Sequence, residues 1–93
     1  MIIRLSPPAS EDLRQAYEHI AQENHEAADR MLTRIVEVVA ILASGAVEGR
    51  EVRLWDGRRV RTWPVPPYRI YYRRGPEVFE IVRLYHQARR PIE

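Results

Sequence analysis

The first half of the chain is patterned as one short strand followed by two amphipathic helices. "MIIRLS" is a short apolar run typical of a strand, and Ser6 followed by Pro7 is typical of a helix N-cap with proline in the first turn. Apolar residues then recur at helical spacing in a first stripe: Leu13, Ala16, Tyr17, Ile20 and Ala21. A second stripe lies between Asn24, a capping residue type, and Gly45, a helix terminator: Ala28, Met31, Leu32, Ile35, Val38, Val39 and Leu42. The pattern predicts two antiparallel helices of roughly 15 and 19 residues, joined by a very short turn.

After Gly49 the pattern changes from helical spacing to alternation. Four segments are rich in strand-forming residues and are separated by turn signals: "EVRLW", "RRVRTWPV", "YRIYYRR" and "VFEIVRLYH". Links this short favour antiparallel hairpins over parallel crossovers. Pro64 lacks a donor for the sheet, so we expect its strand to lie at an edge or to end there. The chain is predicted to be one α+β domain over residues 1–93, with an N-terminal strand and a two-helix hairpin packed on a small, twisted, mainly antiparallel sheet.

Composition excludes several classes of protein. There is no cysteine, and the three histidines lack metal-ligand spacing, so we expect neither disulfides nor a metal site, and no motif requires a cofactor. No apolar run approaches the roughly 20 residues that span a bilayer, and the N-terminus lacks the features of a signal peptide, so we expect a cytoplasmic protein.

Charge is unevenly distributed along the chain. All fifteen basic residues are arginine. Residues 1–48 hold four of them against eight acidic residues, whereas residues 49–93 hold eleven against five. The second half is therefore predicted to face an anionic partner, either nucleic acid or an acidic protein segment.

Four segments, in this order, carry a resemblance to a known family: "SPPASEDLRQAYEHIAQEN", "AADRMLTRI", "PPYRIYYRR" and "EIVRLYHQAR". Over essentially the whole chain they resemble the RelE/ParE superfamily of toxins from bacterial type II toxin–antitoxin modules. The resemblance implies a small toxin, associated with plasmid stabilisation, that a cognate antitoxin holds inactive with its C-terminal segment. Operator DNA would then be contacted only through the antitoxin. The target stays open, because RelE-like members are ribosome-dependent, metal-free mRNA endoribonucleases, whereas ParE-like members poison DNA gyrase.

The resemblance also supplies candidate catalytic residues for the nuclease alternative. Metal-free RNA cleavage needs the ribose 2′-hydroxyl deprotonated, the phosphate charge stabilised and the leaving oxygen protonated. Arg69 matches a phosphate-binding arginine of the nucleases, and His86 matches a histidine that acts as acid or base in some of them. Arg59 and Arg61 are the counterparts of lysines in some members, and they supply charge more easily than proton transfer. The residues after His86 are "QARR", without the tyrosine that the nucleases often carry, which argues against this chemistry.

Strand alternation predicts which of these side chains share a face. If the helices cover Val82 and Leu84, His86 lies at the rim of the core face, away from Arg69, and Ile81 belongs to the other face. That other face, which we call the open face, is predicted to carry Arg69, Tyr71, Arg73, Arg83 and Tyr85, with Arg89 just beyond the strand. Such a surface suits RNA stacking and phosphate contact, and it equally suits an acidic, aromatic antitoxin tail.

Several of these residues also have a structural interpretation. His86 is typical of a strand-end histidine hydrogen-bonded to backbone, and His19 and His25 are typical of solvated groups on helix surfaces. Trp55 and Trp63 are more typical of a core or an antitoxin groove than of platforms for stacked bases.

The helical hairpin favours the gyrase-directed class. Its helices are longer than those of many ribosome-dependent members, and its acidic outer face would be repelled by ribosomal RNA. The sequence therefore predicts a toxin that inhibits DNA gyrase and is neutralised by an antitoxin. Two alternatives remain: a ribosome-dependent mRNA endoribonuclease using Arg69 and His86, and an inactive module that only binds its antitoxin and their operator.

Overall fold

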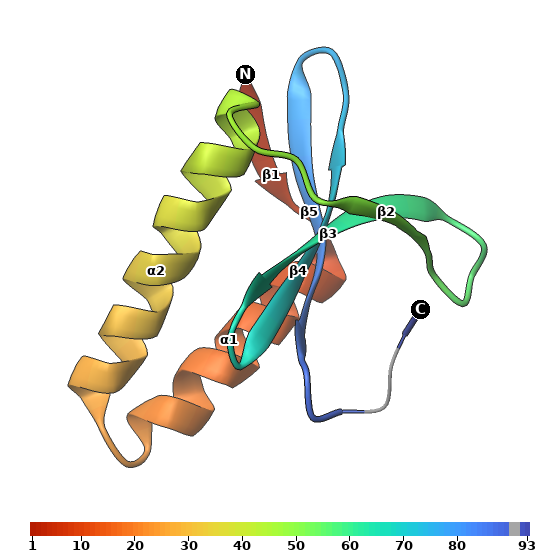
Figure 1. Ribbon diagram of the computed structural model, residues 1–93. Helices are drawn as coiled ribbons and strands as arrows, with labels where there is room; N and C mark the ends of the chain where they lie inside the picture. The colour runs from red at the N-terminus through yellow and green to blue at the C-terminus, as the bar shows by residue number, and fades with distance from the viewer. Residues whose placement is uncertain (90–91) are drawn as a thin grey trace.

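The computed structural model describes residues 1–89 and 92–93, and within them every predicted element is present (Figure 1). The helices are α1 (Pro7–Ala21) and α2 (His25–Ser44). The strands are β1 (Ile2–Leu5), β2 (Arg50–Arg53), β3 (Arg59–Val65), β4 (Tyr68–Arg74) and β5 (Val78–His86). They form one sheet in the order β1-β5-β4-β3-β2, and Figure 1 shows the helical hairpin on one side of it. The predicted α+β architecture is confirmed.

Local capping explains where the helices begin and end. The Ser6 hydroxyl accepts a hydrogen bond from the Ala9 N–H at 3.1 Å, and the Asn24 side chain accepts one from the Ala27 N–H at 3.0 Å. Each satisfies one of the N–H groups that lack a partner at a helix start. Gly45 ends α2 with φ of 81°, a left-handed conformation that glycine adopts without steric cost. Neither helix in the described part of the chain is long and apolar enough to cross a membrane.

The sheet combines an antiparallel meander with one parallel strand. The strands β2 to β5 pair antiparallel in sequence order, and β1 lies parallel to β5 at the edge. Pro64 lies beyond Thr62, the last residue of β3 that pairs with β2, so β3 is an edge strand at that point. This is the position predicted for a proline that cannot donate to a ladder.

A β-bulge changes which residues of β5 face the helices. Tyr71 pairs with Arg83 but Tyr72 pairs with Ile81, so β5 contains one extra residue, Val82. The extra residue reverses the alternation on one side of it. Ile81 therefore packs in the helix-side core, whereas Val82, only 1% exposed, packs on the open face with Tyr71. The prediction that Val82 faces the helices and Ile81 the open face was wrong for this reason.

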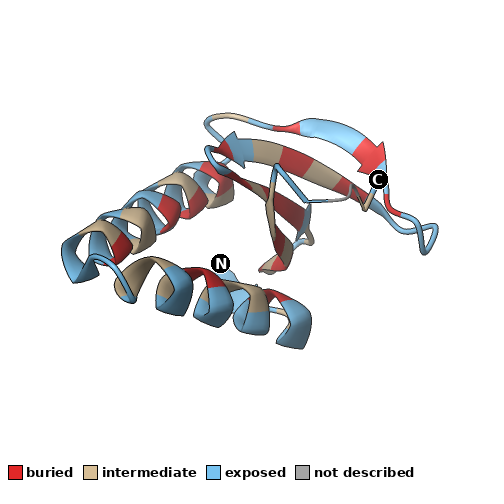
Figure 2. Cartoon of the chain, turned by 90° about the horizontal axis from the view of Figure 1, so that it is seen from below, coloured by how far each residue is buried: buried red, intermediate tan, exposed pale blue. Residues whose placement is uncertain are grey.

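Two apolar clusters thus lie on opposite faces of the sheet. The larger one fills the space between the sheet and the hairpin, and Figure 2 shows buried positions both on the two helices and along the strands. The smaller one lies on the open face and consists of Val52, Leu54, Val60, Tyr71 and Val82. The open face is therefore not a continuous polar surface, and its polar groups surround a small core of their own.

Candidate interaction surface on the open face

Tyr71 anchors the polar groups of the open face. Its side chain lies in the small apolar cluster, with only 4% of the residue exposed, and its hydroxyl donates a hydrogen bond to Glu93 Oε2 at 2.7 Å. Burial and this bond together raise the pKa of Tyr71 to about 12, so the phenol stays neutral and remains a donor at neutral pH. Arg50 Nη2 binds the other carboxylate oxygen of Glu93 at 3.2 Å.

Arg69 lies beside this pair and is held by a neutral partner. It shares the open face with Tyr71, two residues along β4, and its Nη1 donates to Thr62 Oγ1 at 3.2 Å. The Thr62 hydroxyl in turn donates to the carbonyl of Ile70 at 3.0 Å. Within residues 1–89 and 92–93, no carboxylate forms an ion pair with Arg69. We call Arg50, Arg69 and Tyr71, which lie around the Glu93 carboxylate, the open-face site.

Arg73, predicted to be available on the same face, is neutralised within the chain. Its Nη2 binds Glu80 Oε1 at 2.6 Å, and Arg4 binds the other oxygen of Glu80 at 3.1 Å. The hydrogen bond from Arg73 is the main reason that the pKa of Glu80 is lowered. Arg73 is thus engaged at the β1 end of the sheet.

Arg83, also expected beside Arg69, instead binds the first helix. Its Nε and Nη2 donate to the two carboxylate oxygens of Asp12 at 2.6 and 2.9 Å, and these bonds raise the pKa of Arg83. Asp12 also accepts the backbone N–H of Leu84 at 3.1 Å. Strand β1 pairs with β5 only as far as Ile81, so Asp12 provides the acceptor that a neighbouring strand would otherwise supply to β5.

Tyr85 and Arg89 lie at the edge of the open face, near the C-terminal end of β5 and just beyond it. Tyr85 pairs with Arg69 across the two strands and packs partly against the small apolar cluster. Two guanidinium groups lie over its ring, those of Arg83 and Arg89, at 5.4 and 5.8 Å from the centroid. This is a cation–π arrangement on the tyrosine face. Arg90, the last arginine of the basic segment, lies outside the described residues.

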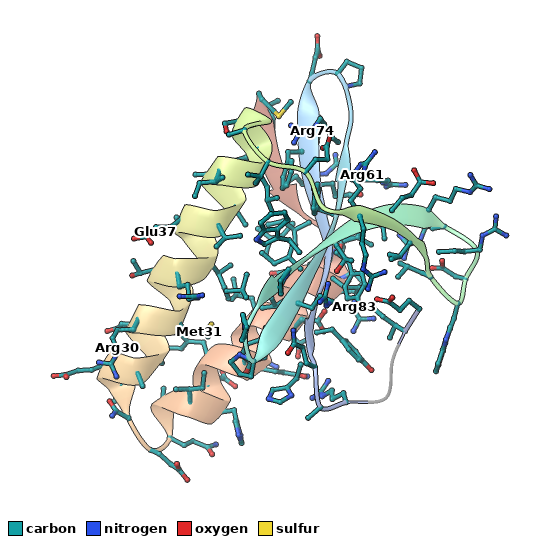
Figure 3. All side chains as sticks on the ribbon, in the orientation of Figure 1. Arg30, Met31, Glu37, Arg61, Arg74 and Arg83 are labelled. Carbon is teal, nitrogen blue, oxygen red and sulfur yellow. The ribbon has the colours of Figure 1, made fainter. Side chains whose placement is uncertain are left out.

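The candidate nuclease residues His86, Arg61 and Arg69 do not converge. His86 pairs with Tyr68 on the helix side, and its ring stands edge-on to that of Tyr68 at 5.2 Å. Arg61 is also on the helix side but pairs with Tyr72, four residues further along β4, which is about 13 Å at the usual rise of a strand. Arg69 is on the open face. Figure 3 shows Arg61 beside Arg74, near the end of α2.

Each of the two helix-side residues has a local partner. His86 Nδ1 accepts the backbone N–H of Ala88 at 3.0 Å, a contact that fits its interpretation as a strand-end histidine. His86 also lines an open cavity of about 440 Å³ together with His19. Arg61 Nη1 donates to the carbonyl of Gly49 at 2.8 Å, and its Nε lies 3.9 Å from Glu48.

The tryptophans have different environments. Trp63 packs against the helix-side core, whereas Trp55 is 63% exposed and is not a core residue. The Trp55 backbone N–H donates to the carbonyl of Ile92 at 2.9 Å, and its indole N–H donates to that of Glu93 at 3.2 Å. His19 and His25 are exposed, as expected.

Sequence reasoning missed the acidic partners of the arginines. Asp12, Glu80 and Glu93 were not singled out, because Asp12 and Glu93 lie 71 and 43 residues from the arginines that they bind and Glu80 meets Arg73 across a hairpin. No pattern of spacing reports such a pairing. Among the described residues, no group of three or more histidine, aspartate or glutamate side chains is arranged to hold a metal ion.

Comparison with known proteins identifies a family and a similar fold. The family model described as the ParE toxin of the type II toxin–antitoxin system parDE matches residues 3–91. Among solved structures, the fold is similar to a chain of the chromosomal ParDE toxin–antitoxin system from P. aeruginosa, with a TM-score of 0.72 and 24% identity. That match covers 92% of this chain and 95% of the other. No curated protein matches the chain in sequence.

Proposed function

Because this chain belongs to the ParE toxin family of type II toxin–antitoxin systems, we propose that it arrests growth by inhibiting DNA gyrase and that a cognate antitoxin neutralises it. Gyrase is the target that the resemblance to ParE-like toxins implies. Operator DNA is contacted through the antitoxin in this proposal. The alternative target, the ribosome, requires a nuclease site.

The observation that carries the choice of target is the separation of Arg69 from His86 by the sheet itself. An acid or base and a phosphate-binding group must reach the same ribose and phosphate, within hydrogen-bond distance. Arg69 lies on the open face and His86 on the helix side. Side-chain rotation does not bring groups on opposite faces of a sheet to one atom. The geometry therefore disfavours RNA cleavage by this pair.

The outer surface of the hairpin is a second argument against the ribosome. Its exposed residues include several acidic side chains, among them Glu11, Glu18 and Glu26, and Figure 3 shows Glu37 pointing away from the sheet. Negative charge on this surface is repelled by the phosphate backbone of ribosomal RNA. A protein target such as gyrase has no such general restriction.

The test is to add purified, antitoxin-free protein to gyrase from the native host with supercoiled plasmid and ATP, and to look for trapped cleavage complexes. We expect linear DNA after denaturation of the enzyme, with a programmed ribosome reaction leaving its mRNA intact. Unaffected gyrase together with mRNA cut in the ribosomal A site would overturn the proposal. Loss of that cutting in Arg69→Ala or His86→Ala would then identify the nuclease. No effect on either target would favour a module that only binds.

An apolar groove supports the proposal of neutralisation by an antitoxin. It lies between α2 and β1, encloses about 230 Å³, and is lined almost entirely by aliphatic side chains, including Ile3, Leu5 and Val36. Val36 is 59% exposed and Ile3 is 47% exposed, so apolar area remains in contact with water. An amphipathic antitoxin helix would bury it.

Substitution of one groove residue separates antitoxin binding from target inhibition. Val36→Asp places a charge in the groove, and we expect it to weaken antitoxin binding at least about tenfold while gyrase inhibition is retained. Glu37→Ala is the matched control, because Glu37 is the adjacent residue of α2 but points away from the sheet. Equal antitoxin affinity of both variants would show that the antitoxin binds elsewhere. Isothermal titration calorimetry measures both affinities.

A further inference from the structure

We propose that the open-face site is a docking site for an extended acidic segment of a partner protein. In this segment an apolar residue directly precedes a glutamate or aspartate. In the isolated chain, Ile92 and Glu93 occupy the site and reveal its chemistry. The proposal does not depend on gyrase being the target.

The first feature of the site is a pair of backbone contacts. The Trp55 N–H donates to the carbonyl of Ile92 at 2.9 Å, as an N–H does in a β-ladder, and the Trp55 indole N–H donates to the carbonyl of Glu93 at 3.2 Å. These bonds recognise the main-chain oxygens of two consecutive residues. They fix the register of an extended chain without regard to its side chains.

The second feature is an apolar contact next to those carbonyls. Ile92 packs against the small apolar cluster and is itself partly buried. That cluster includes Val52 and Val82, which are 9% and 1% exposed. An aliphatic side chain at this position covers a core that the sheet alone leaves open on one face. The site therefore selects an apolar residue.

The third feature is a carboxylate-binding pair at the following residue. Tyr71 and Arg50 donate to the two oxygens of Glu93 at 2.7 and 3.2 Å, and Arg69 adds positive charge from the same face. Burial raises the pKa of Glu93, but the bond from Tyr71 and the bond and charge of Arg50 outweigh it and leave the pKa lowered. The carboxylate is thus ionised near neutral pH.

These features fit a peptide better than a nucleic acid. A phosphodiester chain offers charge to Arg50 and Arg69, but it has neither successive carbonyls for Trp55 nor an aliphatic group for the cluster. A tethered segment competes with an external one at a high effective concentration, so the native chain should bind a partner more weakly than a chain whose own segment is displaced.

The two indole signals of Trp55 and Trp63 provide the readout, since the chain contains two tryptophans. In ¹H–¹⁵N spectra, we expect Ile92→Gly/Glu93→Gln in the full chain to move the Trp55 indole signal and to leave the Trp63 signal in place. Addition of the peptide "ARRPIE", which reproduces residues 88–93, should move the Trp55 signal back. The apparent Kd should be at least about tenfold lower for this variant than for the native chain.

Controls test the chemistry of each contact. The peptide with glutamine in place of its glutamate should bind at least about tenfold more weakly, and so should the original peptide when Arg50→Gln is added to the variant. An unchanged Trp55 signal in the variant, or no peptide-induced shift, overturns the proposal. Displacement of the peptide by an oligonucleotide of uridines at equal phosphate concentration would also overturn it, in favour of a phosphate site. Circular dichroism confirms that each variant is folded.

Discussion

Asp12 is the position where one substitution tests the link between the hairpin and the sheet. Its carboxylate binds Arg83 through two hydrogen bonds and accepts the Leu84 N–H as well. The Asp12 side chain is 9% exposed and that of Arg83 is 28% exposed, so water screens this pair less than a surface pair. Asp12→Ala leaves a partly buried guanidinium without its counter-ion and a strand N–H without its acceptor.

The expected cost follows from these three bonds. Hydrogen bonds to charged groups contribute about 1.5 to 3 kcal/mol, and an unsatisfied buried N–H costs about 1 to 3 kcal/mol. Water reaches part of the edge of β5, so we expect the free energy of unfolding to fall by about 2 to 4 kcal/mol. In a domain of this size that corresponds to a decrease in Tm of roughly 10 to 25 °C. Asp12→Asn keeps an acceptor for Leu84 but removes the charge, and should cost about half as much.

Urea denaturation followed by circular dichroism measures the change. The matched control is Glu11→Ala, because Glu11 is the preceding residue of α1 and pairs with Arg14 in water, with both side chains at least half exposed. Such a pair contributes less than about 1 kcal/mol. A double-mutant cycle with Arg83→Ala should give a coupling of at least about 1 kcal/mol. The reasoning is refuted if Asp12→Ala destabilises no more than Glu11→Ala, or if the cycle shows no coupling.

Three further predictions concern packing, pH and the histidine. A Cβ at Gly49 would lie 2.0 Å from the Thr62 carbonyl oxygen, so Gly49→Ala should displace β2 and lower the free energy of unfolding by about 3 kcal/mol, as measured by thermal unfolding. In Gly75→Ala the nearest neighbour of the added Cβ lies at 3.4 Å, so the free energy of unfolding should be nearly unchanged. The pKa of Tyr71 is raised in the folded state, so stability present below pH 10 should be lost as pH rises towards about 12, by about 1 to 2 kcal/mol. Urea titrations between pH 9 and about 12 should therefore show a steeper loss for the native chain than for Tyr71→Phe, and parallel curves would contradict the assignment. His86→Ala should cost about 1 kcal/mol by removing its contacts with the neighbouring ring and backbone, yet leave growth arrest on expression without antitoxin unchanged; a folded but harmless variant would instead support a catalytic histidine.

The sequence by itself determined the elements and their order. Helical spacing, the caps at Ser6 and Asn24, the terminator Gly45 and the turn residues between strands are local signals, and each predicted boundary lies within a few residues of the observed one. The placement of His86 and Arg69 on opposite faces also followed from alternation, because no irregularity lies between His86 and its partner in β4.

Only the tertiary structure decided which faces of the sheet the residues of β5 occupy beyond the bulge. No glycine or proline lies at Val82 to signal the bulge in the sequence. One extra residue is enough to exchange the faces on which Ile81 and Val82 lie. The bulge depends on how β5 fits between its neighbours, which is a property of the whole sheet.

Tertiary structure likewise decided which arginines remain available. Composition predicts a basic second half, but Arg83 binds a carboxylate 71 residues away and Arg73 binds one across a hairpin, whereas Arg69 is left beside a neutral hydroxyl. Net charge is a sum over the residues of a segment, whereas ion pairs form between groups that are close in space. Only the folded chain brings Tyr71, Arg50 and Glu93 together, so the open-face site was not visible in any spacing of the sequence.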